Sequence, residues 1–371
     1  MTIADGASYA PTSELRAVVE PGEFCFAAAF LDHGHIYGQV NGLLGAGATL
    51  TKVYDPDPTR VAAFCKAFPQ VSAVESFDEL LTDQEVQLIA AAAIPDQRAG
   101  IGARVLDADK HYFTDKSPFT TLTQLAAIKE KVAETGKRYL VYYSERVHNE
   151  AAWHAGEMVA QGAVGDVIQV LNIAPHRLSA DTRPDWFFQK QRYGGIITDI
   201  GSHQVEQFLT YAGAVDAQIN FAAVRNHANP DTPELEDFGE FSLAGVRADS
   251  GPGADAVTET QRPSFYSRID WYTPTGSPVW GDGRTFILGT QGSIEVRKYM
   301  DVAHSAPASK VYYTGTEGVE EFDCLNKVGF PFFGQMILDV LNTTEQAMSQ
   351  AHIFKAAEIS LRAQALADSA P

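Results

Sequence analysis

Two histidines separated by one residue, His33 and His35, follow an apolar run of strand length at 24–31 and precede a segment with helical spacing of apolar residues. An HxH pattern after a first strand is typical of some zinc hydrolases built on a barrel, in which Asp32 can be a further ligand. A strand, a tight turn and a helix also open a dinucleotide-binding fold, where backbone N–H groups and the helix dipole bind pyrophosphate. The stretch therefore indicates either a metal centre or a dinucleotide site.

A metal centre of the barrel type needs further ligands at the ends of the later strands. The later strand-length runs end at 54–55, 74–75, 93–94, 114–115 and 144–145, and no histidine stands at these ends. The alternation of strand and helix patterns also stops after the sixth strand, which is short of a (β/α)₈ barrel. We therefore predict no metal, and we expect the two imidazoles to shape the turn and line a cofactor cleft.

The dinucleotide interpretation has to account for a turn without the glycine fingerprint GxGxxG. Gly38 can serve as its third glycine, but His33 and His35 stand at the first two positions, with Gly34 between them. The context survives, because an acid, Asp55, ends the second strand. An acid at that place hydrogen-bonds the adenosine ribose hydroxyls and repels a 2′-phosphate, which favours NAD over NADP.

The elements that would position these residues alternate between two periods from Glu23 to Ser144. The apolar runs of strand length are 24–31, 49–54, 71–74, 86–93, 111–114 and 139–144. Segments with helical spacing lie between them, and their boundaries carry cap signals: Asp57 before Pro58, the capping-box pair Ser76 and Glu79, and Gly136 at a helix end. Strands that are apolar on both faces and alternate with helices predict a doubly wound, Rossmann-type parallel sheet.

The pattern changes after Val147. A helix at 149–161 and a strand at 166–174 are followed by a polar, aromatic loop, a helix from Ile200, and helical spacing from Phe332 onward. Strand-like runs without helices between them lie at 217–225, 236–245, 266–273, 285–290 and 292–297. Such a succession predicts an α+β domain on an open, mostly antiparallel sheet.

The division expected from these patterns has three parts. They are an N-terminal extension at 1–22, an NAD-binding domain at 23–145 and a substrate-binding and oligomerisation domain at 146–371. The role of the extension stays open, since it can be disordered or can reach a neighbouring subunit. The Gly-, Ala- and Pro-rich run at 247–263 is predicted to be a flexible surface loop.

Composition narrows the classes of partner and compartment. The net charge of −19 over 371 residues lacks the basic footprint that nucleic acids and anionic membranes require. The three cysteines, Cys25, Cys65 and Cys324, lie far apart, so we expect reduced thiols. The start has no signal-peptide pattern, and no later run approaches the apolar length of a membrane span. A soluble, cytoplasmic protein is expected.

Two further motifs resemble those of one family. The first is "DKSP" at 115–118, after the fifth strand, and the second is "YGGIITDIGSHQVEQFL" at 193–209. Together with "AAIP" at 92–95 and "ILGTQGSIEVRKY" at 287–299, they resemble the Gfo/Idh/MocA family of sugar and polyol dehydrogenases over nearly the whole chain and in the same order. The chain departs from the family pattern at Asp115 (usually Glu), at the inserted Ser117 and at Glu206 (usually Asp).

The resemblance implies that Lys116, Asp199 and His203 meet at an active site. Oxidising a hydroxyl requires a hydride to leave carbon while a base takes the hydroxyl proton, and histidine suits the base role because its ordinary pKa of about 6.5 lies near working pH. We assign that role to His203. Lys116 would hydrogen-bond the same oxygen and favour its developing negative charge. Asp199 would hold a neighbouring hydroxyl or pair with Lys116, although its position also suits a helix cap.

The candidate binding residues follow from the same arrangement. The expected cofactor-binding set is Asp32, His33, Gly34, His35, Ile36, Tyr37, Asp55, Ala93, Ile94, Pro95, Arg98, Asp115 and Lys116. The expected substrate-binding set is Lys116, Arg146, His148, His176, Arg177, Arg183, Trp186, Asp199 and His203. Aromatic faces suit carbohydrates and bidentate arginines suit carboxylates. Trp186 and the phenylalanines beside it are equally consistent with core or subunit-contact positions.

These observations predict an NAD-dependent dehydrogenase that oxidises a secondary hydroxyl of a sugar, glycoside or cyclic polyol, with NADP disfavoured. Two alternatives stay open. One is a glycoside hydrolase that uses tightly bound NAD transiently, and the other is a non-catalytic binding or regulatory protein on the same scaffold. The expected partners are a small carbohydrate or polyol and further copies of the chain, as a homodimer or homotetramer through the C-terminal sheet, because an open sheet needs its exposed face covered.

Overall fold

The chain forms two compact units in the structure, which is a computed structural model describing residues 6–12, 14–247, 262–304 and 306–369. The first unit comprises Ala7–Tyr142 and Phe330–Phe354. The second comprises Tyr143–Gly329 with the chain ends Met1–Gly6 and Lys355–Pro371. The first unit thus takes up residues 330–354, which the predicted division placed in the C-terminal domain, because their aromatic side chains pack on its helices.

The first unit is built on a parallel sheet. Its strands are β1 (Cys25–Ala29), β2 (Thr49–Tyr54), β3 (Ser72–Ala73), β4 (Leu88–Ala91), β5 (His111–Asp115) and β6 (Tyr139–Tyr142). They lie in the order β3-β2-β1-β4-β5-β6, and every pair is parallel. The strand order reverses between β1 and β4, which is where doubly wound sheets bind their ligands. The predicted Rossmann sheet is confirmed.

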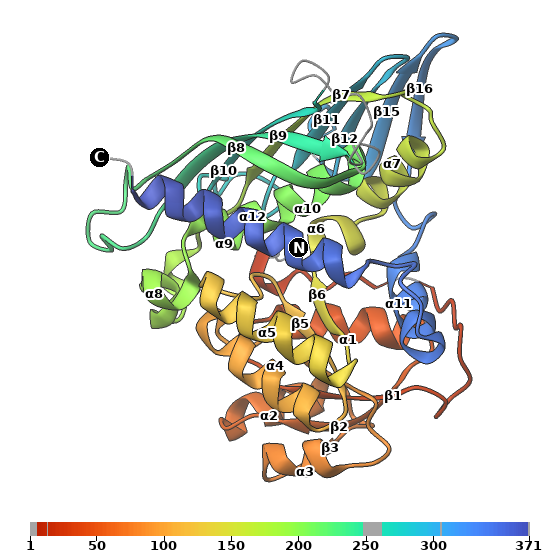
Figure 1. The fold of residues 1–371 in the computed structure, drawn as a ribbon, viewed down its shortest axis with the longest axis vertical. Coiled ribbons are helices and arrows are strands. Elements are labelled where there is room, and N and C mark those ends of the chain that lie inside the picture. Colours follow the sequence, from red (N-terminus) through yellow and green to blue (C-terminus); the bar gives the residue numbers. More distant parts are fainter. Residues whose placement is uncertain (1–5, 13, 248–261, 305, 370–371) are drawn as a thin grey trace. The chain divides into compact units, whose positions relative to one another are not determined.

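Helices flank this sheet (Figure 1). They are α1 (His35–Gly45), α2 (Pro58–Ala67), α3 (Phe77–Thr82), α4 (Arg98–Asp107), α5 (Leu122–Thr135) and α11 (Pro331–Asn342). The predicted boundaries are confirmed: Asp57 accepts from the Thr59 N–H, Ser76 and Glu79 form a capping box, and Gly136 ends α5 with a φ of 67°. Close packing of α11 on α1 requires Gly42, since a Cβ there would overlap the Phe333 ring.

The N-terminal extension lies against this unit where it is described. The Arg16 N–H donates to the Gly45 carbonyl at 2.9 Å, and the Val18 N–H donates to the Ala46 carbonyl at 3.0 Å. These bonds satisfy carbonyl groups at the C-terminal end of α1 that the helix itself leaves without a partner. The segment therefore caps α1 within its own chain.

The second unit is built on an eight-stranded sheet. Its strands are β7 (Val167–Pro175), β8 (Ala214–Arg225), β9 (Phe238–Arg247), β10 (Ser264–Asp270), β11 (Arg284–Gly289), β12 (Ser293–Arg297), β15 (Lys310–Gly315) and β16 (Gly318–Asp323). The order is β16-β15-β12-β11-β7-β10-β9-β8, with only the β7–β10 pair parallel. A separate hairpin joins β13 (Met300–Asp301) and β14 (Ala306–Pro307). The predicted open, mostly antiparallel sheet is confirmed.

The strands β15 and β16 were not expected from the sequence. β16 is almost entirely exposed, so its residues do not alternate between apolar and polar and give no strand signal. The predicted loop at 247–263 lies largely outside the described residues.

The helices of the second unit are α6 (Ser144–Val147), α7 (Glu150–Ala160), α8 (Lys190–Tyr193), α9 (Ile196–Asp199), α10 (Gly201–Ala212) and α12 (Gln350–Asp368), the last of which begins in the first unit. Of these, α7, α9 and α10 pack on the sheet. α10 contacts β7, β8, β9 and β10, and α7 contacts β12 and β15. Large apolar side chains of alternate strand positions stay exposed, including Phe221, Phe286 and Leu288.

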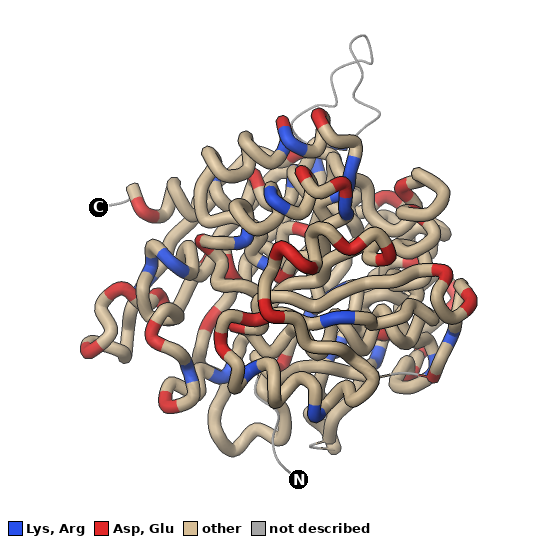
Figure 2. The backbone as a smooth tube through the Cα atoms, turned by 90° about the horizontal axis from the view of Figure 1, so that it is seen from below, with Lys and Arg blue, Asp and Glu red and all other residues tan. Residues whose placement is uncertain are grey.

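Charge and hydropathy agree with the composition. Figure 2 shows Asp and Glu positions spread over many described segments of the chain, in keeping with the net charge of −19. Among the described residues, no helix combines the length and the apolar content needed to cross a bilayer.

Candidate functional site

The turn between β1 and α1 is fixed at the point where the strand order of the first sheet reverses. The Ala92 N–H donates to the Phe30 carbonyl at 3.1 Å, and the His33 N–H donates to the Ala92 carbonyl at 2.9 Å. Phe30 takes a positive φ of 52°, which redirects the chain at the end of the strand. The turn is therefore bonded to the segment that follows β4, and α1 begins directly after it.

Asp115 joins the two histidines of this turn. Its Oδ1 atom lies 2.9 Å from Nδ1 of His35, and its Oδ2 atom lies 3.4 Å from Nδ1 of His33. The carboxylate is fully buried, and both imidazoles are mostly buried. Burial raises the pKa of Asp115, but His35 and Arg98 outweigh it and hold the pKa well below its ordinary value. Burial and the neighbouring His35 lower the pKa of His33, so His33 is neutral at pH 7.

The spacing of His33, His35 and Asp115 is that of a metal site, and they form the one such group within the described residues. The carboxylate, however, already has three neighbours that can donate. They are Nδ1 of His35, the Lys116 N–H, which donates to Oδ1 at 2.8 Å, and Arg98 Nη2, which donates to Oδ2 at 3.3 Å. Nδ1 of His33 instead accepts from the His35 N–H at 3.3 Å. Arg98 is itself fixed by the carbonyls of Ala93 and Ser117, at 2.7 and 3.0 Å. A divalent ion would meet this guanidinium, so the donor set indicates a hydrogen-bonded cluster.

Asp55 ends β2 beside the turn, as expected, but its carboxylate is engaged. Oδ2 accepts from the Leu31 N–H at 2.6 Å, and Oδ1 accepts from the Asp57 N–H at 2.7 Å. Arg60 on α2 donates to Asp32 at 2.6 Å and lies 3.5 Å from Asp55. A guanidinium beside the acid at the end of the second strand suits a 2′-phosphate. Arg60 was not among the predicted cofactor-binding residues, because a single arginine on a helix belongs to no recognisable motif.

The remaining cofactor candidates line the same edge. Gly34, Ile36 and Tyr37 belong to the start of α1 and the residue before it, and Ala93, Ile94 and Pro95 follow β4. The Tyr37 ring packs on Phe64 and Phe68, with centroids 5.6 and 6.0 Å away, which places it between α1 and α2.

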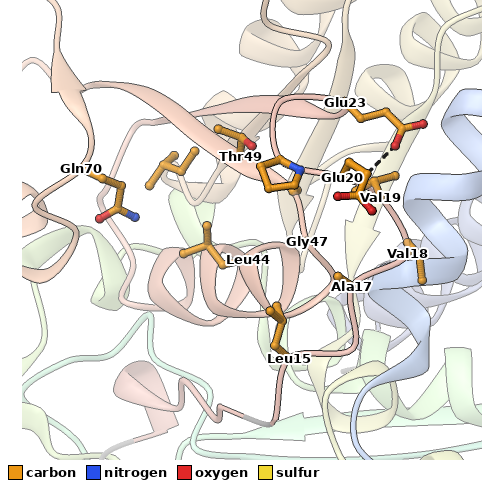
Figure 3. A pocket seen from close by; sticks show the side chains of 13 residues that line it. Leu15, Ala17, Val18, Val19, Glu20, Glu23, Leu44, Gly47, Thr49 and Gln70 are labelled. Carbon is orange, nitrogen blue, oxygen red and sulfur yellow. Dashed lines mark hydrogen bonds between the residues drawn. The ribbon is translucent and has the colours of Figure 1, made fainter.

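The first unit also has a pocket of about 680 Å³ (Figure 3). It lies at the amino end of β2, away from the carboxyl ends of the strands. It is bounded by Leu15, Val18 and Glu20 of the N-terminal segment, by Leu44 near the end of α1 and by Thr49 at the start of β2. Ligands of doubly wound sheets bind beyond the carboxyl ends of the strands. Because this pocket faces the amino end of β2, it is separate from the candidate site.

The second unit holds a buried charged network around Glu145 of α6. Oε2 of Glu145 accepts from Lys298 Nζ at 2.8 Å and from Gln204 Nε2 at 3.0 Å. Oε1 lies 3.6 Å from Nε2 of His176. The Glu145 and Lys298 side chains are 2% and 1% exposed. Burial raises the pKa of Glu145, but Lys298, His203 and His176 outweigh it and hold the pKa well below its ordinary value.

A second buried ion pair joins α6 to α10. Arg146 Nε lies 2.8 and 2.9 Å from the two oxygens of Glu206, and its Nη2 also donates to that carboxylate. The guanidinium carbon lies 5.5 Å from the Trp153 ring centroid. Arg146, predicted to bind substrate, is thus committed to Glu206, and this two-pronged contact fixes the orientation of α10.

α9 and α10 carry the proposed catalytic residues of this unit. His203 and Asp199 are 2% and 8% exposed. Asp199 ends α9, and the residue before α10 is Ile200, with no side-chain capping bond. Whether Asp199 caps a helix or contacts substrate stays a prediction. The Tyr143 ring lies against His203, with centroids 6.2 Å apart.

Comparison with known proteins decides the family. A family model for an oxidoreductase NAD-binding Rossmann fold matches residues 27–143, and the model of a Gfo/Idh/MocA C-terminal domain matches residues 153–295. The chain belongs to the Gfo/Idh/MocA oxidoreductase family. The resemblance seen in the sequence is confirmed. The Rossmann domain of this chain is an NAD(P)-binding domain.

Individual relatives agree with this placement. A crystal structure assigned as an oxidoreductase from Erwinia carotovora atroseptica is 43% identical, with a TM-score of 0.86 over 93% of this chain and 99% of that chain. A structure from Thermotoga maritima is 18% identical, with a TM-score of 0.75 over 93% and 98% of the two chains, which shows the fold alone. An uncharacterised oxidoreductase of Schizosaccharomyces pombe is 27% identical over 147 residues, which span 40% of this chain and only 39% of that relative.

In this Gfo/Idh/MocA chain, the other predicted substrate residues of the second unit differ in the contacts that their side chains make. Arg177 Nη2 donates to the carbonyls of Pro274, Ser277 and Val279, at 3.1, 2.9 and 2.9 Å, which gives it a loop-holding role. Arg183 lies over the rings of Phe187 and Trp271, at 4.5 and 5.1 Å. His148 and Trp186 are buried. Lys116 belongs to the first unit and His203 to the second, so their meeting beside the cofactor stays a prediction.

Two buried charged residues of the second unit, Glu145 and Lys298, were not among the site residues predicted from the sequence. Glu145 was visible only as the polar end of the sixth apolar run. Lys298 lies in the motif at 287–299, but no role was assigned to it. They are 153 residues apart, and neither type nor spacing links them. Only the fold brings their side chains together.

Proposed function

We propose that this protein is a dehydrogenase that oxidises a secondary hydroxyl of a sugar, glycoside or cyclic polyol with NAD as acceptor. The observation that carries the proposal is the buried His203 on α10, set among charged groups in the C-terminal unit of a chain whose other unit is an NAD(P)-binding domain. An imidazole with an ordinary pKa of about 6.5 is the side chain best suited to exchange a proton near neutral pH.

The first unit fits a dinucleotide. Helix α1 begins shortly after β1, at the point where the strand order reverses, and the N–H groups at its N-terminus can bind a pyrophosphate. His33, Gly34 and His35 would border the pyrophosphate, with the His35 imidazole held by Asp115. Asp55 and Arg60 would border the adenosine ribose. When bound, the nicotinamide supplies the hydride acceptor. NAD is proposed from the acid at the end of β2, although Arg60 makes the same edge able to accept a 2′-phosphate.

The protein residues would then divide the work on the hydroxyl group. His203 would take the proton of the hydroxyl group. The carbon that bears this hydroxyl would lose its hydrogen as hydride to the nicotinamide, so that the products are a ketone, the reduced cofactor and one proton. Lys116 donates a hydrogen bond to the same oxygen and stabilises negative charge that develops there. Asp199 holds a neighbouring hydroxyl or the Lys116 ammonium.

Structural neighbours of the same fold suggest which compounds to test. One is an aldose-aldose oxidoreductase from Caulobacter crescentus complexed with glycerol, and another is an oxidoreductase from Agrobacterium radiobacter in complex with NAD⁺, L-tartaric acid and magnesium. A third is a 3-ketoreductase from Actinomadura kijaniata in complex with NADP. At 14–15% identity they establish the fold only, and their small hydroxylated ligands motivate the choice of test compounds.

The proposal extends to assembly and location. The exposed apolar residues Phe286 and Leu288 on the uncovered face of the second sheet would contact another copy of the chain. A homodimer or homotetramer through this face and a cytoplasmic location are proposed. No metal is proposed at His33 and His35, because Asp115 already accepts from His35, Lys116 and Arg98.

The decisive test is a turnover screen. The protein is incubated with NAD or NADP and a panel of aldoses, uronic acids, glycosides and inositols, and the absorbance of the reduced nicotinamide is followed. Accumulation that depends on one substrate class supports the proposal. Cleavage of a glycoside without accumulation would instead indicate transient redox hydrolysis, and cofactor binding without turnover on any compound would indicate a binding protein.

A further inference from the structure

His33 lies in the turn between β1 and α1, and one nitrogen of its imidazole is already committed. The His35 N–H donates to Nδ1 of His33 at 3.3 Å, and the Ile36 N–H donates to the His33 carbonyl at 3.2 Å. A backbone N–H can only donate, so Nδ1 of His33 offers its lone pair. This bond is compatible neither with a proton on Nδ1 nor with an imidazolium, which carries a proton on both nitrogens.

The neighbouring carboxylate is satisfied by other donors. Oδ2 of Asp115 lies 3.4 Å from Nδ1 of His33, but it accepts from Arg98 Nη2 at 3.3 Å. Oδ1 accepts from the Lys116 N–H at 2.8 Å and lies 2.9 Å from Nδ1 of His35. Both carboxylate oxygens therefore have a donor other than His33, and no proton is required on Nδ1 of that ring.

The surroundings of His33 also favour a neutral ring. Its side chain is 13% exposed, and its ring packs edge-on against the His35 ring with centroids 4.2 Å apart. Burial and His35 lower the pKa of His33 more than Asp115 raises it, and Lys116 and Arg98 lower it further. A neutral imidazole has one N–H, and because Nδ1 accepts, the proton is on Nε2.

The nitrogen that carries this proton is accessible. Among the described residues, Nε2 of His33 has no hydrogen-bond partner, yet it is not one of the polar atoms that are buried without a partner. The accessible part of the ring therefore includes an N–H donor.

This donor stands beside a helix start that suits an anion. Gly34 is the N-cap of α1, which follows the point where the strand order reverses. In the fingerprint GxGxxG, the first glycine allows the tight turn and the second allows the backbone to approach the diphosphate closely. His33 and His35 stand at these two positions, so their rings occupy room that glycine would leave. A hydrogen bond from a ring N–H to an anionic oxygen offsets this loss, because a charged acceptor makes the bond stronger.

We propose that His33 is held as the neutral tautomer with its proton on Nε2, and that this N–H donates to an oxygen of the dinucleotide diphosphate. One ring then replaces a fingerprint glycine through two bonds, because Nδ1 closes the turn and the Nε2–H binds the anion. The tautomer follows from the first unit alone, whereas the donation rests on the proposed use of a dinucleotide.

The tautomer is tested by ¹⁵N NMR of the imidazole rings in the full-length protein without cofactor at pH 7. The His33 signals are assigned by their loss in H33F, and we expect a proton on Nε2 and a lone pair on Nδ1. His111 is the internal reference, because its Nδ1 also accepts a backbone N–H, that of Arg138, at 3.2 Å. A His33 ring that is protonated on Nδ1, or on both nitrogens, would overturn the proposal.

The donation is tested by adding ADP-ribose, which has the diphosphate but no nicotinamide. The Nε2 signal of His33 should move as the site fills, and adenosine, which has no diphosphate, should leave it in place. In calorimetric titration, the Kd for ADP-ribose should be about tenfold higher in H33F, because one hydrogen bond to a charged group is lost. H111F is the matched control at the start of β5 and should leave the Kd unchanged.

H33F also removes the acceptor for the His35 N–H, so a second variant separates the two bonds. In H33N, the side-chain carbonyl can accept the N–H two residues on, while the amide nitrogen does not extend as far as Nε2. H33N should therefore have a higher melting temperature than H33F but should bind ADP-ribose as weakly.

Two kinds of failure are distinguishable. Wild-type affinity for ADP-ribose in H33N, or a His33 signal that ADP-ribose leaves in place while it binds, would overturn the donation alone. A wild-type protein that binds neither NAD, NADP nor ADP-ribose would overturn the donation and the proposed dehydrogenase function together.

Discussion

Nδ1 of His35 lies 2.9 Å from Oδ1 of Asp115, across a separation of 80 residues. This contact connects the start of α1 to the end of β5. Asp115 also lies 3.4 Å from His33 and pairs with Arg98, so the HxH residues belong to a cluster around one carboxylate. The two imidazoles occupy the place where other dinucleotide folds have glycine. The carboxylate holds the His35 ring, and Nδ1 of His33 accepts from the His35 N–H at 3.3 Å.

Replacing this carboxylate should destabilise the protein. Asp115→Asn leaves the buried Arg98 without its anion, and breaking a buried pair in this way typically costs about 3–5 kcal/mol. Denaturant unfolding measures the change in free energy. Asp78→Asn, which breaks the exposed pair with Arg104, is the control and should cost less than about 1 kcal/mol. Equal effects of the two substitutions would show that the cluster does not stabilise the turn.

The proposed proton transfer predicts a loss of turnover without a loss of cofactor affinity. His203→Ala should lower kcat by about 10²- to 10⁴-fold, because the base is absent, and Lys116→Ala should also abolish most turnover. Cofactor affinity, measured by fluorescence titration, should change little. Wild-type rates in either variant would refute the assigned role of that residue.

Cofactor preference should depend on Asp55, which follows β2, and on Arg60 of α2 beside it. Arg60→Ala should weaken NADP binding more than NAD binding, because a guanidinium suits a 2′-phosphate. Asp55→Ala should weaken NAD and narrow its advantage over NADP, and it also removes the acceptor for the Leu31 N–H. Calorimetric titration of both cofactors measures the ratio. An unchanged NAD-to-NADP ratio in both variants would place the adenosine ribose elsewhere.

The pH dependence of stability should have a histidine component in the first unit. Burial, Lys137 and Arg138 lower the pKa of His111 to about 4, and its Nδ1 accepts from the Arg138 N–H at 3.2 Å. The pKa in the folded state is below the unfolded value, so this stabilisation is fully present above about pH 6.5 and is lost as the pH falls towards 4. In His111→Gln, the fall in melting temperature over that range should be shallower than in the wild type. The control His154→Gln changes a more exposed imidazole on α7, and a slope equal to the wild type in His111→Gln would contradict the prediction.

Assembly through the uncovered sheet face is tested at Leu288, which is 47% exposed on β11. Leu288→Glu should shift the protein towards monomers in sedimentation velocity, because it places a charge in an apolar contact. Leu325→Glu, at an exposed leucine outside the strands, is the control. A wild-type protein that sediments as a monomer would exclude the proposed contact.

The folds of both units could be predicted from the order of residue types along the chain. Residues that are apolar on both faces, as in β4, occur only where helices cover a sheet on both sides, and caps such as Asp57 and Gly136 mark where helices begin and end. The motifs around Lys116 and His203 added the family. These signals are local, so they can be read without knowing which strands are neighbours.

The partners of the charged groups, in contrast, could not be predicted without the three-dimensional arrangement of the chain. Asp115 was expected to bind cofactor, yet it holds His35 and Arg98, and Arg146 holds Glu206 instead of facing open space. Glu145 carried no motif, and Lys298 lay in the motif at 287–299 with nothing to indicate that it pairs with Glu145. The strength of a charge–charge contact depends on the distance through space and on burial, and neither is fixed by separation along the chain.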